Sequence, residues 1–205
     1  SAFRNITVLC CTQLRNPSYM EMVHFIPPSQ RRLAMLAAQA DTAPALIFGG
    51  SGTGKGAICR WIHANSPRAT RPFIHADSKS PLIRQLPKAQ GGTFVIDEIG
   101  EWPLGEQKAL LMFLKTRSVP HAENGAMPML LNVRVMVTTS QALEGRAQGG
   151  LFNAELLEKL NVFRIEMPSL SKRGEEFDDI VTGIVGEITR ELHKEHLRNV
   201  SAEAW

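Results

Sequence analysis

Gly49-Gly50-Ser51-Gly52-Thr53-Gly54-Lys55 is the stretch that decides the fold of this chain. It lies between a short apolar run, residues 45–48, and a helical pattern that begins at Lys55 and continues to about Ala64. Glycines at this spacing let successive backbone N–H groups turn inward around an anion, and the following helix points its positive end at the same anion. Lys55 adds a charge for the outer phosphates, so the stretch predicts a phosphate-binding loop. The candidate contacts are Gly50, Ser51, Gly52, Thr53, Gly54, Lys55, Gly56 and Ala57.

The spacing Gly-x-x-x-x-Gly-Lys also fits a glycine-rich turn that carries an exposed lysine. Its position between a predicted strand and a predicted helix favours the phosphate loop. One residue departs from the general pattern, because Gly56 stands where a Ser or Thr hydroxyl usually contacts magnesium. Magnesium binding must therefore rely on other groups.

Two carboxylates, Asp97 and Glu98, follow the apolar run 94–96. The end of a strand is where an α/β sheet presents its chemistry. Asp97 is predicted to hold magnesium through the water shell of the ion, and Glu98 to orient the attacking water as a general base. Together with Lys55 they are the candidate catalytic residues. The alternative interpretation is that the two carboxylates are a solvated pair at the end of a strand. The presence of the phosphate loop in the same chain favours the nucleotide site over this alternative.

Hydrophobic runs and helical patterns alternate along the chain. Strands are expected over residues 45–48, 71–76, 93–97, 133–138 and 162–167, with a further strand over 6–11. Helices are expected over 30–40, 55–64, 104–116, 154–160 and 175–196, the first with Ser29 as its N-cap and the last with Lys172 and Arg173 at its solvated start. This alternation predicts an α/β fold with a parallel sheet covered by helices on both faces.

Composition excludes several classes of protein. Of 205 residues, 43% are hydrophobic and 21% charged, as in an ordinary globular chain rather than a disordered or coiled-coil one. The apolar runs are too short to cross a membrane, and no secretory signal opens the chain. The net charge of +3 is too small to indicate contact with DNA. Three cysteines without metal-like spacing favour a reducing compartment, hence the cytoplasm.

The motifs together resemble the AAA+ ATPase domain of bacterial enhancer-binding proteins, the sigma-54 transcription activators. The blocks that carry the likeness are residues 25–29, 49–55, 62–68, 71–74, 91–99, 107–114, 133–140 and 151–170. The resemblance implies an AAA+ P-loop NTPase core, an αβα sandwich that binds ATP and Mg²⁺. It also implies a homo-oligomer, a ring or dimer whose site a neighbouring subunit completes, and partners among the other domains of a transcription regulator or the RNA polymerase machinery. The expected domains are a strand or linker over 1–24, the core over 25–174 and the start of a helical lid over 175–205.

The chain departs from the family pattern in two functional elements. Activators carry a long insertion with a Gly-Ala-Phe-Thr-Gly-Ala loop that engages sigma-54, whereas only residues 78–90 separate Asp77 from Gly91 here. Asn153 and Lys159 stand where the family has its two trans-acting arginines. Lys159 keeps a charge without the planar fork of an arginine, and Arg146 is a candidate substitute.

Further departures concern the residues around the acidic pair. Asp77 replaces an asparagine that restrains the catalytic glutamate in the family, and a carboxylate there would repel Glu98 at close approach. Thr139 and Ser140 lie at the sensor I position, where Ser140 replaces the usual asparagine. Most of the C-terminal helical lid, with its arginine-bearing motif, is expected to be missing from the chain.

Three interpretations of function stay open at this point. The first is an ATP-binding regulatory domain of a bacterial transcription regulator, with weak hydrolysis and no direct contact with sigma-54. The second is a non-enzymatic module that senses a nucleotide or cyclic dinucleotide, or serves as a scaffold. The third is a true activator whose contact loop comes from elsewhere, for example from a partner subunit. Whether the chain is an ATPase is left open by the residues themselves.

Overall fold

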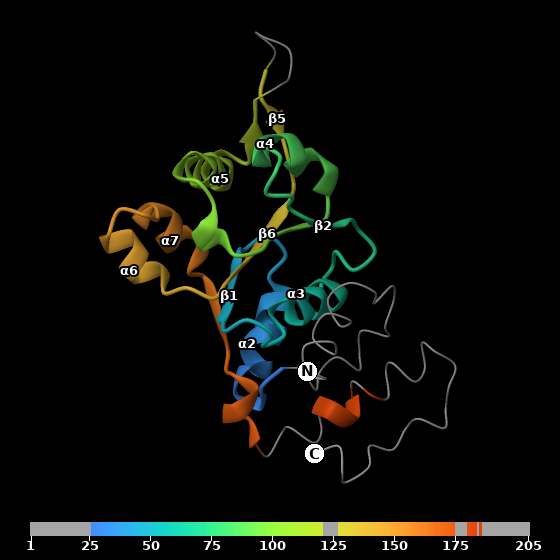
Figure 1. Cartoon of the computed structure of the whole chain (residues 1–205). Helices are drawn as coiled ribbons and strands as arrows, with labels where there is room; N and C mark the ends of the chain where they lie inside the picture. Colours follow the sequence, from blue (N-terminus) through green and yellow to red (C-terminus); the bar gives the residue numbers. More distant parts are fainter. Residues whose placement is uncertain (1–25, 121–126, 175–179, 184, 186–205) are drawn as a thin grey trace.

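A five-stranded parallel sheet forms the centre of the molecule, in the order β2-β3-β6-β1-β7 (Figure 1). The computed structural model describes residues 26–120, 127–174, 180–183 and 185. The strands of the sheet are β1 (Ala45–Gly49), β2 (Phe73–His75), β3 (Thr93–Ile96), β6 (Arg134–Thr139) and β7 (Phe163–Met167). A separate antiparallel pair consists of β4 (Ser118–Val119) and β5 (Met129–Leu130). Because the large sheet is parallel, the loops that follow β1, β3 and β6 emerge at one edge.

Helices cover both faces of the sheet, as the alternating pattern predicts (Figure 1). The α-helices are α2 (Pro28–Gln39), α3 (Lys55–Ala64), α4 (Leu82–Gln85), α5 (Leu104–Thr116), α6 (Leu143–Gln148) and α7 (Ala154–Leu160). The short 3₁₀ turns among the described residues are η2 (Leu86–Ala89), η3 (Ile99–Glu101) and η4 (Leu170–Lys172). The helices predicted over 55–64, 104–116 and 154–160 are confirmed at both ends. The predicted αβα architecture is confirmed.

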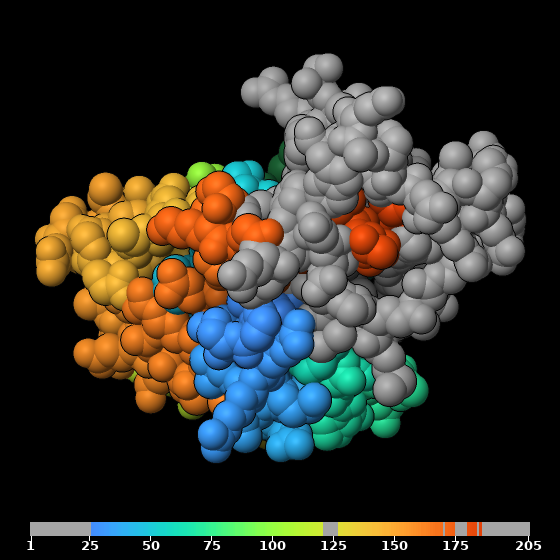
Figure 2. All heavy atoms as spheres, turned by 90° about the horizontal axis from the view of Figure 1, so that it is seen from below, coloured from blue at the N-terminus to red at the C-terminus, as the bar shows by residue number. Residues whose placement is uncertain are grey.

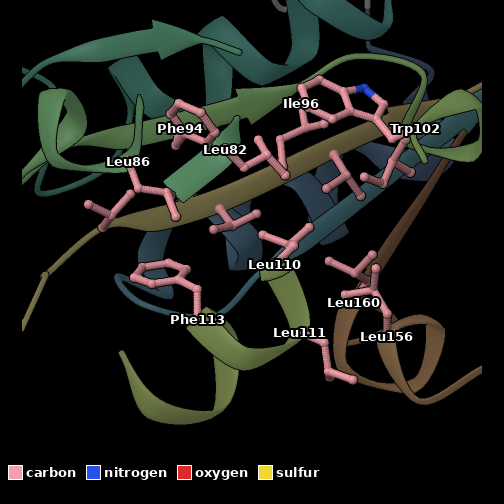
Figure 3. Packing of buried hydrophobic residues seen from close by; sticks show 14 of the residues in the cluster. Leu82, Leu86, Phe94, Ile96, Trp102, Leu110, Leu111, Phe113, Leu156 and Leu160 are labelled. Atoms are coloured by element: carbon pink, nitrogen blue, oxygen red, sulfur yellow. The ribbon is translucent and has the colours of Figure 1, made fainter. Parts of the chain in front are cut away.

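The larger hydrophobic core lies between the sheet and the layer of α4, α5 and α7 (Figure 3). Phe94 and Ile96 of β3 point into it and are fully buried, as is Leu110 of α5. Truncating one such leucine to alanine in a close-packed core costs about 2–5 kcal/mol. This layer therefore holds β3, and with it the acidic pair, in a fixed position.

The second core lies on the opposite face, under α2 and α3. Figure 2 shows α2, in blue, beside the segment that follows β7, in orange. Arg134 of β6 is fully buried on this side and donates a hydrogen bond from Nη2 to the carbonyl of Ala37 near the end of α2. Burial lowers the pKa of Arg134 to about 10. The guanidinium thus joins the end of α2, where the helix dipole is negative, to the central strand.

Some local predictions are wrong. Helix α2 begins at Pro28, without a side-chain cap, so Ser29 lies inside its first turn rather than capping it. Proline at the first helical position already has the required φ, which explains the earlier start. Arg173 is 4% exposed rather than solvated. The elements α4, η2 and α6 are not predicted at all.

Two predicted elements lie wholly or mostly outside the described residues. The strand expected over 6–11 falls there, as does most of the helix expected over 175–196. Residues 180–183 and 185 are helical, and Ile180 is buried in the second core. Among the described residues, no helix combines the length and apolar character that a membrane crossing requires.

Candidate functional site

The phosphate loop connects β1 to the first turn of α3. Its conformation requires glycine, because Gly52 and Gly54 have φ values of +78° and +89°, in the left-handed region. A Cβ atom at Gly49 would lie 2.2 Å from the carbonyl oxygen of Met167, so no side chain fits there. Thr53 Oγ1 donates to the carbonyl of Gly50 at 2.9 Å and closes the loop. No side chain caps α3, which leaves the N–H groups of its first turn available to an anion.

Lys55 connects the phosphate loop with the acidic pair. Its ammonium donates to the carbonyls of Gly49 and Gly50 at 2.9 and 3.0 Å, and it lies 3.0 Å from Glu98 Oε1. The lysine is only 9% exposed, so these contacts define its position closely. The structure therefore brings together the two motifs that the sequence singled out separately.

Asp97 follows β3 and has a defined partner for each carboxylate oxygen. Thr138 Oγ1 donates to Oδ1 at 3.0 Å, and His75 Nδ1 donates to Oδ2 at 3.0 Å. The indole N–H of Trp102 donates to the Asp97 carbonyl at 3.0 Å. The hydrogen bond from His75 is the largest of the influences that lower the pKa of Asp97, and they outweigh the effect of burial. The carboxylate is therefore ionised at neutral pH.

Glu98 has φ +46°, in the left-handed region that a non-glycine residue rarely adopts. Its Oε2 accepts hydrogen bonds from the backbone N–H of Ser140 at 2.7 Å and from the Ser140 hydroxyl at 2.8 Å. Burial alone raises the pKa of Glu98, but the bonds from Ser140 and Lys55 lower it below its ordinary value. A strained backbone held by such contacts is typical of a functional position.

The other two predicted sensor residues, Thr139 and Asp77, have different hydrogen-bond partners from Ser140. Thr139 is buried, and its hydroxyl contacts the backbone of Gln141 rather than the acidic pair. Asp77 lies exposed after β2, where its carboxylate accepts from the N–H of Lys79 at 3.0 Å. No contact between Asp77 and Glu98 occurs among the described residues.

The predicted trans-acting positions lie on α6 and α7, away from this cluster. Asn153 is the N-cap of α7, and its Oδ1 accepts from the N–H of Leu156 at 2.9 Å. Lys159 is exposed near the end of the same helix. Arg146, on α6, is half-buried. Within the described part of the chain, none of the three contacts Lys55, Asp97 or Glu98.

Sequence reasoning missed two residues of the site, His75 and Thr138. Both lie at the carboxyl ends of strands that pair directly with β3, so tertiary pairing brings them to Asp97. A histidine on a three-residue edge strand offers no recognisable motif. Only the expectation that neighbouring parallel strands end at one edge could have indicated it.

The residues present fit a nucleotide with a divalent cation. The loop and the start of α3 supply N–H groups and a lysine for phosphate, and Asp97 supplies an ionised oxygen ligand. No group of three or more His, Cys, Asp or Glu side chains in the described ranges could hold a metal by itself. This matches magnesium sites in which one or two side chains act together with substrate phosphates.

A parallel sheet in this order, with a phosphate loop after β1 and an acidic pair after β3, defines an AAA+ P-loop NTPase fold. The model of the Sigma-54 interaction domain family matches residues 28–170, and the chain belongs to this family. It is similar to the DNA-binding transcriptional regulator NtrC of Klebsiella pneumoniae, with 33% identity over 190 residues. It is also 34% identical over 173 residues to the response regulator protein FleR of Pseudomonas aeruginosa.

These matches cover only part of the relatives. The alignments span 78% and 72% of this chain but 40% and 36% of NtrC and FleR. Among solved structures, NtrX from Brucella abortus in complex with ADP superposes with a TM-score of 0.70 at 24% identity, covering 95% of this chain and 47% of that one. At that identity the likeness supports the fold alone.

Proposed function

We propose that this chain is the ATP-binding AAA+ domain of a bacterial transcription regulator, and that it acts in the cytoplasm as part of a homo-oligomer. The observation that carries the proposal is the contact of Lys55 with both the phosphate loop and Glu98. The contact supports the proposal because it brings the lysine of the loop together with a carboxylate of lowered pKa in one cluster. A nucleotide with Mg²⁺ matches this combination of donors and acceptors.

Replacing Lys55 with alanine tests the nucleotide site. Lys55→Ala removes the charge that faces the outer phosphates, so we expect ATP affinity to fall at least about a hundredfold, which corresponds to about 2.7 kcal/mol. Titration of a fluorescent ATP analogue measures this. Lys88→Ala is the matched control, because Lys88 is exposed on η2, away from the loop. Binding by Lys55→Ala at the wild-type affinity would contradict the proposal.

Hydrolysis by this domain is proposed to be weak. An arginine finger contributes about 10³-fold or more to phosphoryl transfer, and its two family positions are held here by Asn153 and Lys159. The side chain of Asn153 is engaged at the N-terminus of α7, and a lysine lacks the bidentate geometry of a guanidinium.

Steady-state phosphate release from Mg·ATP, measured beside Glu98→Ala, tests this part of the proposal. We expect slow wild-type turnover, about 10³-fold or more below that of an ATPase with an arginine finger, and its loss in Glu98→Ala, because no arginine stands at either family position to stabilise the transition state. Fast multiple turnover that requires Glu98 would instead indicate a working ATPase. The matched control is Glu158→Ala, an exposed carboxylate on α7.

Sigma-54 contact through a Gly-Ala-Phe-Thr-Gly-Ala loop is not part of the proposed function. The chain between β2 and β3 is a compact connection, in which Leu82 and Leu86 are buried in the larger core. The Gln85 side chain closes it, because it bonds to both the N–H and the carbonyl of Asp77 at 2.7 and 2.8 Å. Because this connection is packed into the core and closed by hydrogen bonds, it supports the proposal that the domain does not remodel sigma-54 directly.

A further inference from the structure

His75 lies beside the candidate metal carboxylate and takes no part in the phosphate loop. It ends β2, whose residues pair in parallel register with β3, and its Nδ1 is 3.0 Å from Asp97 Oδ2. The other oxygen of Asp97 is occupied by Thr138. The side chains of His75 and Asp97 are 36% and 53% exposed, so a solvated ion can reach both.

The spacing of this pair suits a shared cation as well as a hydrogen bond. Two neighbouring ligands of an octahedral ion, each at about 2.1 Å, are separated by about 3.0 Å. The nitrogen and the oxygen are therefore as far apart as two adjacent ligand atoms around one divalent cation. Neither side chain has to move far for both to contact the same ion, once the ring takes the tautomer that carries its proton on Nε2 and frees Nδ1 as a ligand.

Gly56 adds a second and independent observation. Helix α3 runs antiparallel to β3, because Lys55 meets Glu98 at one end and His63 Nδ1 meets Thr93 Oγ1 at the other, 2.9 Å apart. On the same helix face, the Arg60 guanidinium lies 5.7 Å from the ring centre of Phe73 in β2. Position 56 precedes Arg60 by one helical turn, and His75 follows Phe73 by two residues on the same strand face.

These two steps are of similar length and run in the same direction, so we expect position 56 to lie toward the end of β2 that carries His75. The rings of Phe73 and His75 are 5.2 Å apart, which confirms that they share a face of β2. A Cβ atom at Gly56 would have no neighbour within 4 Å, and Gly56 has no positive φ. The place where a P-loop usually offers a hydroxyl to the metal is therefore open space.

We propose that His75, together with Asp97, coordinates the divalent cation that accompanies the nucleotide, in place of the hydroxyl missing at position 56. This inference rests on the proposed nucleotide site and deepens it. Imidazole nitrogen is a better ligand for Mn²⁺ and Co²⁺ than for Mg²⁺, which prefers oxygen. The site is therefore selective for Mn²⁺ relative to a P-loop site built from oxygen ligands alone.

A purely positioning role for His75, as a hydrogen-bond donor to Asp97, makes a different prediction. His75→Gln keeps an N–H donor at similar reach but supplies no ligand nitrogen, whereas His75→Ala removes both. Coordination requires that both variants lose Mn²⁺ affinity to a similar extent. Positioning requires that His75→Gln retains it.

The test uses the full chain with Mn²⁺ and ATPγS, a slowly hydrolysed analogue. Electron spin echo envelope modulation detects a histidine nitrogen bound to Mn²⁺, and ¹⁵N-labelled histidine separates it from the nitrogens of the nucleotide. We expect nitrogen coupling in the wild type, its loss in both His75 variants, and about a tenfold or greater loss of Mn²⁺ affinity with a smaller loss for Mg²⁺. In His75→Ala, the added substitution Gly56→Ser is expected to restore binding of Mg²⁺. Lys79→Gln, an exposed change nearby, is the control.

Two results would overturn the inference alone: no histidine coupling in the wild type, or wild-type Mn²⁺ affinity in His75→Gln. Nucleotide binding is measured separately, with and without EDTA. Failure of the wild type to bind the nucleotide under any of these conditions would overturn the proposed function, and the inference with it. Nucleotide binding that persists while the His75 variants keep their cation affinity rejects the inference only.

Discussion

Ser140 determines how strongly Glu98 is held as an anion. The residue donates both its backbone N–H and its hydroxyl to the same carboxylate oxygen, and Lys55 contacts the other oxygen. Hydrogen bonds to the charged form of a carboxyl lower its pKa. Ser140, the residue predicted to lie at the sensor I position, therefore bonds directly to the candidate base.

Ser140→Ala is predicted to raise the pKa of Glu98. The variant removes the hydroxyl donor but keeps the backbone N–H, so the pKa moves toward the ordinary value of 4.5 without the loss of all stabilisation of the anion. Titration of ¹³C-labelled glutamate carboxyls by NMR measures the change, and Glu98→Gln assigns the signal. An unchanged or lowered pKa would show that the hydroxyl contact is absent in solution.

Gln107 connects three elements in the larger core. It lies in α5, is fully buried, and donates from Nε2 to the carbonyl of Trp102 at 2.7 Å. Its Oε1 accepts from the N–H of Asn153 at 2.9 Å, at the start of α7. One amide side chain therefore pairs with a backbone carbonyl in the segment after Glu98 and with a backbone N–H at the start of α7, the helix that carries Lys159.

Gln107→Leu is predicted to destabilise the fold by about 1–3 kcal/mol, because it leaves a buried carbonyl and a buried N–H without partners while conserving volume. Urea denaturation followed by circular dichroism measures the free energy of unfolding. Lys108→Leu, an exposed change on the same helix, is expected to stay within about 0.5 kcal/mol of the wild type. A Gln107 variant as stable as this control would mean that solvent replaces both bonds.

The elements that sequence reasoning located are those with a long pattern or a motif. Helices α3, α5 and α7 have apolar residues at helical spacing, and β3 is a fully buried strand that is apolar from Phe94 to Ile96. The missed elements are short: α4 has four residues, and η2 begins at Leu86 with a proline next. In such segments tertiary burial decides the conformation, because a single turn has too few hydrogen bonds to be stable alone.

The residues of the candidate site also fall into two groups, those that a sequence motif indicates and those that only tertiary structure brings together. Lys55, Asp97 and Glu98 belong to contiguous motifs and could be named from the sequence. His75 and Thr138 reach Asp97 only through strand pairing, which a single sequence does not specify. Asp77 illustrates the limit of carrying over one aligned position, since a local turn and Gln85 determine its contacts here.

At the scale of the whole molecule, the site lies at one edge of the sheet, and the residues predicted to act in trans lie apart from it, on or at the start of α6 and α7. Helix α7 packs against α5 through the larger core and through an ion pair of Lys115 with Glu155, 2.5 Å apart. Within the described residues, Lys159 lies exposed on this helix and does not contact Glu98. A functional role for it in turnover therefore requires the site of another copy of the chain.

Mixing two variants tests this requirement. Lys159→Ala and Glu98→Ala are each predicted to lack the residual turnover, because each removes one half of a composite site. In an equimolar mixture that exchanges subunits, about one quarter of head-to-tail interfaces join an intact Glu98 to an intact Lys159. We therefore expect phosphate release near that fraction of the wild-type rate, increasing with protein concentration as subunits associate. Mixing Glu98→Ala with Lys55→Ala is the control, because both substitutions lie in the same half of the site and no interface regains it. Turnover independent of concentration would place the whole site within one chain. Recovery in that control would show that Lys55 and Glu98 act from different chains, which contradicts the contact between them within one chain.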